Sequence, residues 1–519
     1  MTQDLAQAAA LAAAAARAGR ATVDDWNTLG WAHAVSGDAD GAGRMFQQAL
    51  ALAPRDPEAL TGLAGLLRAA GQLRDAALHC DAAIAARPTY PEAWLERAYV
   101  MAAGGAMEEA RACYTRVVAL VPGHAAAHAG LAAIAARDGD GAAVRQQASA
   151  ALASEPGNAI ALAALATVEL EGGNAAAARA LIEPATLGLP TPSPERMQLL
   201  HLLGDACART GDAAAAHAAY AHANQDFATI NAALFAGREP HADFVSRVAA
   251  QIGALNPAQW APPTDPSPAS RHVFVLGYPR SGNTLLENIL ASLPNTQALE
   301  EHPTLREADL AFLAEPGGLG ALDQLDADRL AELRHAYWER VRAAGIAPEG
   351  RVFVDMDPLK SIRLPLIARL FPEARVLLVR RDPRDVVWSC FRTGFALTNA
   401  AMDFTTLPGT ARHYAATMRL VAAACAQLPL MLDEVHYHRL VQDFDATTQA
   451  ICAFLDVPWT EDLRRFDRTA RARGVSTASA RQVRQGLYDG TRQWQPFAPW
   501  LEPVLPVLQP WIEALGYEA

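Results

Sequence analysis

The chain is almost without lysine: among 44 basic residues in 519, Lys360 is the only lysine and the others are arginine. It also lacks an excess of positive charge, because 56 acidic residues give a formal net charge of -12. Divided at Ser270, the first part carries 17 basic and 26 acidic residues and the second part 27 and 30. A surface that binds nucleic acid needs a net positive face. We therefore expect no nucleic-acid partner.

Long apolar runs and clustered cysteines are absent as well. No window approaches the roughly 20 strongly apolar residues that a membrane-spanning helix needs, since Arg, Asp or Glu interrupts even the alanine runs. Residues 1–20 lack the charged-then-apolar layout of a secretion signal and predict an amphipathic helix. The six cysteines form neither a C-x-x-C pair nor a dense framework, which favours reduced, buried thiols and no structural metal. These absences predict a cytoplasmic protein that has no membrane segment.

A repeat of 34 residues fills the first half of the chain. In one copy, Trp26 and Gly30 precede a turn at Gly37, and Ala42 and Phe46 follow it. This pattern resembles the tetratricopeptide repeat, in which small residues let two antiparallel helices pack closely and glycine turns the chain. Two residue types keep the period over five copies: Gly37, Gly71, Gly105, Gly139 and Gly173, with Pro54, Pro88, Pro122, Pro156 and Pro190.

The resemblance implies an all-α solenoid at the amino terminus. One repeat does not bury its apolar face alone, so stacked repeats form a curved array with a concave surface. Such a surface commonly holds a peptide or protein partner; the alternative is that the array only supports the second domain or forms a homodimer. We assign repeats to residues 23–56, 57–90, 91–124, 125–158 and 159–192, and an offset sixth copy to about 197–226.

The repeat signal ends near Asp226, and a proline-rich segment follows. Residues 227–260 keep a helical pattern, whereas four prolines fall within seven residues of the segment 261–270. Prolines at this density interrupt regular structure and are typical of a connection between domains. We predict a repeat domain at 1–226, a linker at 227–270 and a second domain at 271–519.

The second domain opens with a strand, a glycine-bounded loop and a helix. The loop, Gly-Tyr-Pro-Arg-Ser-Gly-Asn-Thr at 277–284, follows an apolar run and precedes helical spacing. In this arrangement backbone N–H groups and a helix amino terminus converge on an anion. Asn283 stands where an ATP- or GTP-hydrolysing enzyme has lysine, which argues against magnesium-dependent triphosphate chemistry. Arg280 offers a cation inside the loop instead.

Two more apolar segments, 351–355 and 374–380, are strand candidates, and each precedes a helical stretch. This alternation is typical of an α/β domain with a parallel sheet. The second segment runs into Arg381, and Ser389 falls on the following helix. Such a pair predicts another anion site at the sheet edge where α/β folds bind ligands.

Together these motifs resemble the bacterial tetratricopeptide-repeat sulfotransferases, relatives of the tyrosylprotein sulfotransferases. The resemblance rests on residues 278–286, on 381–385 with Ser389, and on 475–484, and the domain order fits over 23–519. It implies a P-loop-type α/β domain that uses 3′-phosphoadenosine 5′-phosphosulfate (PAPS) as donor and releases 3′-phosphoadenosine 5′-phosphate (PAP), without a metal. We expect the acceptor to be a hydroxyl, with a tyrosine of a peptide or protein held by the repeats as the candidate, because a solenoid groove suits an extended chain.

The resemblance also implies which residues bind the donor. Arg381 and Ser389 would hold its 3′-phosphate, which requires Arg280 and Arg381 to face a common cavity. The loop residues would hold the 5′-phosphosulfate: Arg280, Ser281, Gly282, Asn283 and Thr284. A late segment would cover the donor with three side chains: Ser479, Gln482 and Arg484.

For catalysis the family uses a glutamate after the loop helix, and by resemblance this residue is Glu301 rather than the adjacent Glu300. A carboxylate accepts the proton of the acceptor hydroxyl while the oxygen attacks sulfur in line with the leaving phosphate. Arg280 would stabilise the negative charge of the group in transfer without a metal.

One position departs from the family pattern. The family lysine in Asp-Lys-x-Pro is Met356 here, because residues 355–360 read Asp-Met-Asp-Pro-Leu-Lys. Either Lys360 replaces it beside the leaving group as a third catalytic residue, or turnover is weak and the domain is a PAP- or PAPS-binding pseudoenzyme whose repeats recruit protein partners. The position of the only lysine in this segment favours the first hypothesis, since arginine serves wherever charge alone is needed.

Overall fold

The structure, a computed structural model, describes residues 3–189, 191–315, 317–473 and 486–518. Internal contacts divide the chain into two compact units. Unit 1 contains Met1–Thr191 and Gln198–Gly211, and unit 2 contains Pro192–Met197 and Asp212–Ala519. The predicted fold class, a helical solenoid followed by an α/β domain with a parallel sheet, is confirmed.

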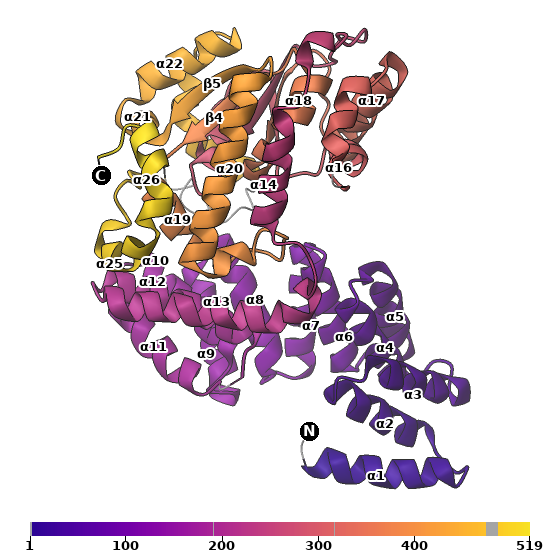
Figure 1. Ribbon diagram of the computed structural model, residues 1–519. Helices are drawn as coiled ribbons and strands as arrows, with labels where there is room; N and C mark the ends of the chain where they lie inside the picture. Colours follow the sequence, from indigo (N-terminus) through magenta and orange to yellow (C-terminus); the bar gives the residue numbers. More distant parts are fainter. Residues whose placement is uncertain (1–2, 190, 316, 474–485, 519) are drawn as a thin grey trace. The chain divides into compact units, whose positions relative to one another are not determined.

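Unit 1 is a series of helices that pack in consecutive pairs (Figure 1). The first helix confirms the prediction for residues 1–20, and the following pairs alternate with the glycine spacing. Its helices are α1 (Gln3–Arg17), α2 (Val23–Val35), α3 (Ala39–Leu52), α4 (Pro57–Ala69), α5 (Leu73–Ala86), α6 (Pro91–Ala103), α7 (Met107–Leu120), α8 (Ala125–Asp138), α9 (Gly141–Ser154), α10 (Ala159–Glu171), α11 (Ala175–Leu187) and most of α12 (Pro194–Arg209).

Glycine is required in this unit for two different reasons. The five turn glycines, of which Gly37 is the first, have φ between 74° and 83°, a left-handed conformation that disfavours other residues. Gly30 instead lies against a neighbouring helix, because a Cβ there would approach the Phe46 ring to 2.5 Å. Phe46 is fully buried, so the close approach of α2 and α3 depends on the missing side chain.

Unit 2 is built around a five-stranded parallel sheet in the order β2-β3-β1-β4-β5. The sequence predicted β1, β3 and β4, whereas β2, five residues long and only partly buried, was missed. The carboxyl ends of all five strands lie at one edge of the sheet, since parallel strands share their direction. The strands are β1 (Arg271–Leu276), β2 (Thr296–Glu300), β3 (Val352–Met356), β4 (Arg375–Arg380) and β5 (Met431–His436).

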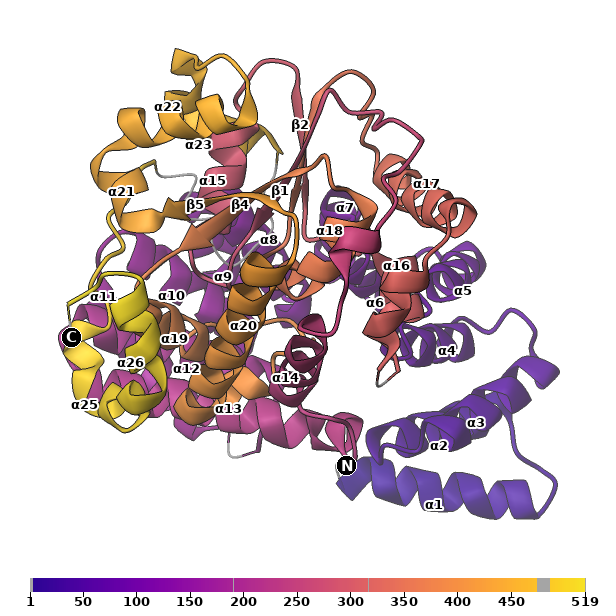
Figure 2. The ribbon, with the colours of Figure 1, turned by 45° about the horizontal axis from the view of Figure 1, so that its top comes forward.

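Helices cover both faces of the sheet (Figure 2). Along β1, Val273 and Val275 face α15 and α22, whereas Phe274 and Leu276 face the layer of α14, α17, α18 and α20. Both sets are buried, as expected for a parallel sheet between two helical layers. The helices of this unit are α13 (Ala213–Phe235), α14 (His241–Ile252), α15 (Asn283–Leu290), α16 (Arg306–Phe312), α17 (Ala327–Ala343), α18 (Leu364–Leu370), α19 (Pro383–Phe391), α20 (Leu407–Gln427), α21 (Tyr437–Gln442), α22 (Phe444–Leu455), α23 (Phe466–Arg473), α25 (Ala498–Leu501) and α26 (Leu505–Ala514).

The segment predicted as a linker at 227–270 is part of the core of unit 2. On α14, Val245, Val248 and Ile252 are at most 1% exposed and belong to the same apolar cluster as the sheet. Helix α13 also packs within this unit, where Asn224 Nδ2 donates to Phe391 O at 2.8 Å. Apolar spacing alone did not separate a helix that joins domains from one that completes a core.

Two further findings concern the described residues only. No helix in this part of the chain is both long and apolar enough to cross a membrane. Within the same residues, no group of three or more His, Cys, Asp or Glu side chains could hold a metal ion. Of the six cysteines, Cys425 is exposed and the others are buried as free thiols.

Candidate active site

Each strand of the sheet contributes to one polar edge. The loop 277–282 follows β1, Glu301 follows β2 and Asp357 follows β3, while Arg381 and Tyr437 follow β4 and β5. Ligands of open α/β sheets bind at the carboxyl ends of the strands. This edge is therefore the candidate active site.

The loop after β1 is held rigidly by side chains around it. Ser361 Oγ donates to Gly277 O at 2.6 Å and accepts from Gly277 N at 3.0 Å. Asn283 Nδ2 donates to Tyr278 O at 2.8 Å, so the residue that replaces the nucleotide-hydrolase lysine fastens the loop. A Cβ at Gly277 would lie 2.6 Å from Asn283 Oδ1. The close packing explains why glycine begins this loop.

Arg280 has a left-handed backbone with φ of 69°, and its Nε donates to Ser389 Oγ at 3.1 Å. Arg381 Nη1 in turn donates to Arg280 O at 2.8 Å. Burial, helped by Arg392 and Arg381, lowers the pKa of Arg280 to about 10. The arginine stays protonated at neutral pH, and a bound anion would offset the cost of its buried charge.

A cavity of about 430 Å³, called here the Glu301 cavity, collects several predicted residues. Glu301 and Asp357 lie on it with the apolar side chains of Phe395 and Phe404. Four of the residues predicted to bind the donor also line it: Arg280, Gly282, Asn283 and Thr284. Ser281, which is 2% exposed, lies within the loop and does not line the cavity.

Glu301 is held by its backbone on the lining of this cavity. Its N–H donates to Met356 O at 2.7 Å, and its φ is 47°. The side chain keeps contact with solvent. Even so, partial burial of the carboxylate, together with the charges of Asp357 and Glu300, raises its pKa to about 7. A carboxylate with this pKa is well matched to accept a proton near neutral pH.

The structure places Lys360 in a buried ion pair, whereas the hypothesis set it beside the leaving group in place of the family lysine. It lies in the 3₁₀ turn Pro358–Arg363, is 1% exposed and does not line the Glu301 cavity. Its ammonium forms an ion pair with Asp355 and donates to Thr304 Oγ1 at 3.1 Å and His302 O at 3.2 Å. The three N–H bonds are thus used inside the protein. Met356, at the family lysine position, is fully buried.

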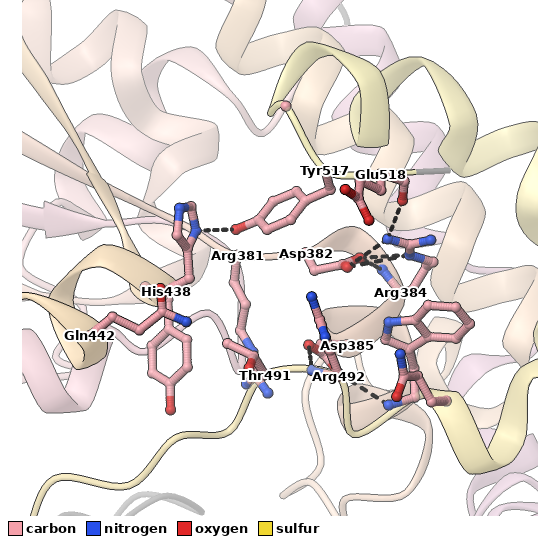
Figure 3. A pocket seen from close by; sticks show the side chains of 14 residues that line it. Arg381, Asp382, Arg384, Asp385, His438, Gln442, Thr491, Arg492, Tyr517 and Glu518 are labelled. Carbon is pink, nitrogen blue, oxygen red and sulfur yellow. Dashed lines mark hydrogen bonds and ion pairs between the residues drawn. The ribbon is translucent and has the colours of Figure 1, made fainter.

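Arg381 lines a second cavity of about 460 Å³, called here the Arg381 cavity (Figure 3). Asp385 accepts from the backbone N–H groups of Arg492 and Trp494 at 2.8 and 3.1 Å, and this holds residues 492–494 over α19. On the opposite wall Tyr517 meets His438, with 3.0 Å between the hydroxyl and Nδ1. Arg280 is absent from the described lining of this cavity, so the two arginines line different cavities.

The expected common cavity for Arg280 and Arg381 is therefore not observed, although the two residues touch. The reason is that Arg381 uses two N–H groups on backbone carbonyls, those of Arg280 and Gly490. Its Nε is buried and has no hydrogen-bond partner among the described residues. Ser389, 2% exposed, is occupied by Arg280. The donor residues Ser479, Gln482 and Arg484 lie outside the described residues.

Tyr437 contacts both Arg381 and the loop after β1, and the sequence analysis did not predict it as a site residue. Its ring lies under Arg381, 4.8 Å from Cζ to centroid, and a Cβ at Gly282 would come within 2.7 Å of it. Its hydroxyl donates to Tyr488 O at 2.8 Å and accepts from Gly490 N at 3.1 Å. The usable signal was its place directly after a strand. Its contacts are with residues far away in the sequence, so no local sequence pattern indicates them.

Comparisons with known proteins give family matches in both parts of the chain. Residues 272–461 match the model of the sulfotransferase family, and residues 27–91 and 67–134 match tetratricopeptide-repeat models. An uncharacterized protein of Aquifex aeolicus (strain VF5) is 30% identical over 252 residues, which are 47% of this chain and 33% of that protein. The chain thus spans a third of the length of this relative. The predicted resemblance to a repeat-bearing sulfotransferase is confirmed.

Two other similarities concern named proteins. Protein-tyrosine sulfotransferase 1 of Danio rerio is 22% identical over 257 residues, covering 47% of this chain and 72% of the relative. The solved sulfotransferase domain from the curacin biosynthetic pathway is 21% identical, with a TM-score of 0.34, covering 49% of this chain and 99% of the solved chain.

Proposed function

We propose that this chain, whose residues 272–461 carry a sulfotransferase-family domain, moves a sulfuryl group from PAPS to an acceptor hydroxyl. The observation that carries the proposal is the Glu301 cavity, where Arg280 and the loop residues face a carboxylate whose pKa is raised to about 7. A cation, backbone donors and a base around one space are the parts that an in-line group transfer needs.

In the proposed reaction the acceptor hydroxyl gives its proton to Glu301. The oxygen–sulfur bond forms while the bond between sulfur and the bridging phosphate oxygen breaks, and PAP leaves with the bonding electrons on its 5′-phosphate. Arg280 and the backbone N–H groups at the start of α15 balance the charge that develops on this phosphate. No proton needs to reach the phosphate, because it leaves as an anion.

We keep the assignment of the other end of the donor, its 3′-phosphate, to Arg381 and Ser389, although the described structure lacks the common cavity that this assignment requires. In the described structure Ser389 accepts from Arg280, and Arg381 lines the neighbouring cavity. Binding at this position would replace the Arg280–Ser389 hydrogen bond by bonds from both groups to phosphate. The unpaired Nε of Arg381 supports the assignment, because a buried donor without an acceptor costs free energy that a phosphate oxygen would recover.

An aromatic hydroxyl is the acceptor that suits the cavity. Phe395 and Phe404 are 5.0 Å apart between ring centroids and line the same cavity as Glu301. In its described lining, Glu301 and Asp357 are the carboxylates and Arg280 is the cation. We expect kcat/KM to be about tenfold higher for neutral and cationic phenols than for a phenol that carries a carboxylate, because Glu301 and Asp357 repel negative charge. Measuring kcat/KM for phenol, tyramine and 4-hydroxyphenylacetate checks this expectation. In Asp357→Asn, the difference in kcat/KM between 4-hydroxyphenylacetate and the other two phenols should become smaller.

Transfer of labelled sulfate from PAPS to a panel of phenols and tyrosine peptides tests the function, with calorimetry of PAP binding beside it. Arg280→Met and Arg381→Met should each weaken PAP binding roughly 10- to 100-fold, the loss of one charge-assisted contact. Arg419→Met, which removes an exposed arginine on α20, is the control. Failure of PAP to bind the wild-type chain would overturn the assignment.

A second candidate function, a PAP-binding scaffold without turnover, is favoured by one observation. Met356 is fully buried at the family lysine position, and Lys360 is engaged with Asp355. This candidate predicts PAP binding that responds to Arg280→Met, with no transfer to any acceptor of the panel. The same two measurements therefore separate it from the enzyme.

A further inference from the structure

A buried polar cluster lies directly behind the loop that carries Glu301. Lys360, Asp355, Thr304, Tyr337 and His272 are each at most 3% exposed. Asp355 Oδ1 pairs with Lys360, and its Oδ2 accepts from Thr304 Oγ1 at 2.8 Å and from the Tyr337 hydroxyl at 2.9 Å. The carboxylate is fully engaged, as a buried ion pair requires.

The hydrogen bonds at the far end of the cluster fix its protonation. Because the Tyr337 proton goes to Asp355, His272 Nε2 must donate to the Tyr337 oxygen, 2.8 Å away. Burial lowers the pKa of His272 well below its ordinary value, so the ring is neutral with Nδ1 unprotonated. Nδ1 has no partner among the described residues, which agrees with this tautomer. The cluster therefore holds one cation and one anion.

This cluster is attached to the Glu301 loop at two points. Lys360 Nζ donates to His302 O and to Thr304 Oγ1, one and three residues beyond Glu301. On the other side, Glu301 N donates to Met356 O, next to Asp355 at the end of β3. The left-handed backbone of Glu301, rare for a residue other than glycine, needs such support from its surroundings.

The charges around Glu301 also point to Lys360. Asp357 after β3 and Glu300 on β2 raise the pKa of Glu301, whereas Lys360 lowers it. Arg280 lines the same cavity from the loop after β1. Glu287 on α15, itself paired with Arg473, feels the charges of Glu300 and Glu301. Lys360 is thus the cation that acts against two acidic neighbours.

We propose that Lys360 is a positioning residue of the active site: through Asp355 and Thr304 it fixes the backbone of residues 301–304, so that Glu301 faces the cavity as a carboxylate. The proposal rests on the proposed function for the role of Glu301, and it replaces a direct contact of Lys360 with the leaving group. It also explains why this position is the only lysine in the chain, because the larger planar head group of arginine does not fit this fully buried site.

Lys360→Met tests the proposal with two readouts that need no activity. Hydrogen exchange measured by mass spectrometry should accelerate in residues 300–305 and stay unchanged in α15. Carbodiimide labelling of Glu301 against pH should shift its midpoint upward by about half a unit, the effect of one screened charge. Arg363→Met removes another cation of the same 3₁₀ turn, paired instead with Asp309, and should leave both readouts unchanged.

Because Lys360→Met leaves Asp355 buried without its counter-charge, the double variant Lys360→Met/Asp355→Asn is measured beside it. This variant removes both charges, so it separates loss of folding from loss of positioning. Faster exchange of residues 300–305 should persist in it, since the lysine N–H bonds to His302 O and Thr304 are still absent. The Glu301 midpoint should return toward the wild-type value, because loss of the Asp355 anion offsets loss of the lysine cation. If neither variant folds, hydrogen exchange of residues 300–305 in Thr304→Val tests the proposal alone: faster exchange supports it, and unchanged exchange contradicts it.

Activity then separates this proposal from the function itself. With an active wild-type chain, the acidic limb of kcat/KM against pH should move upward by about half a unit in Lys360→Met. Lys360→Arg should restore the limb in part, because it keeps the charge. A drop in kcat with an unmoved limb and unchanged exchange would instead mean direct contact with the leaving group, and the positioning role would be wrong. An inactive wild-type chain would defeat the proposed function, while exchange and labelling still decide the role of Lys360.

Discussion

At the residue scale, two adjacent glutamates differ in what surrounds them. Glu301 lines the cavity that holds the loop residues, whereas Glu300 ends β2 and is absent from the described lining. We expect Glu301→Gln to lower kcat by about 10²- to 10⁴-fold, the usual contribution of a general base, with PAP affinity nearly unchanged. Glu300→Gln is the control and should keep most of the activity.

The pH dependence of the wild type follows from the same residue. A base must be deprotonated to work, and the pKa of Glu301 is raised to about 7. Activity should fall about tenfold per unit below pH 7 and level off above it. A profile that stays flat between pH 5 and 7 would show that another group is the base.

Glu287 on the loop helix makes a second residue-scale prediction. It is fully buried and paired with Arg473, and burial raises its pKa from 4.5 to about 7. The folded state therefore binds more protons than the unfolded state between these pH values, so this group lowers stability as pH rises from 4.5 to 7. The loss amounts to about 3 kcal/mol.

Removing the ionisable group removes this pH dependence. We expect the free energy of unfolding of Glu287→Gln, relative to wild type, to become more favourable as pH rises from 5 to 8. Urea unfolding at several pH values measures it, with Glu502→Gln on the exposed surface as control. A constant difference between the Glu287 variant and wild type would contradict the raised pKa.

Part of the cavity lining was predictable at this scale, because the loop after β1 and Glu301 lie in short sequence motifs. Four of the predicted donor residues and Glu301 share one cavity. The hydrogen bonds of Lys360 were not predictable, since its acceptors at Thr304 and His302 lie 56 and 58 residues away in sequence. Tyr437 was hidden for the same reason, because Gly490 is 53 residues from it.

At the scale of elements, the first helix pair shows what the repeat glycines do. Gly30 of α2 faces the buried ring of Phe46, and an added Cβ would come within 2.5 Å of it. Gly30→Ala should cost about 1–3 kcal/mol through overpacking. Gly157→Ala, at a turn where a Cβ would meet nothing within 4 Å, is the control and should change stability by less than about 0.5 kcal/mol. Thermal unfolding of the full chain measures both.

The elements were predictable to the extent that their signals repeat or alternate. The period of 34 residues located the helix pairs, since glycine turns and apolar faces recur together. Strand β2 escaped because its five residues, Thr-Gln-Ala-Leu-Glu, bury one side chain fully and have no continuous apolar run. Helix α14 was recognised as helical, but its burial against the sheet was not, because periodicity gives no partner.

At the scale of the whole molecule, the boundary of the second unit has a direct test. Internal contacts place residues from Asp212 onward in unit 2, including α13 and α14. A fragment that begins at Asp212 should fold cooperatively and bind PAP, because it keeps the apolar residues of α14. A fragment that begins at Arg271 loses Val245, Val248 and Ile252 from the core and should aggregate or melt at a much lower temperature.

Circular dichroism melting and PAP calorimetry compare the two fragments with the full chain. Equal stability of both would mean that α14 contributes little to the core. Loss of folding in both would mean that unit 2 depends on residues before Asp212.

The burial of the single lysine has one more consequence. Lys360 is 1% exposed and bonded at its three N–H groups, so its ε-amino nitrogen has no lone pair to offer an acylating reagent in the folded state. Because Lys360 is the only lysine in 519 residues, an active ester acylates a lysine of this chain only when the structure around β3 opens. The rate at which that peptide gains the mass of one acyl group therefore measures how often unit 2 opens around β3, without interference from any other lysine.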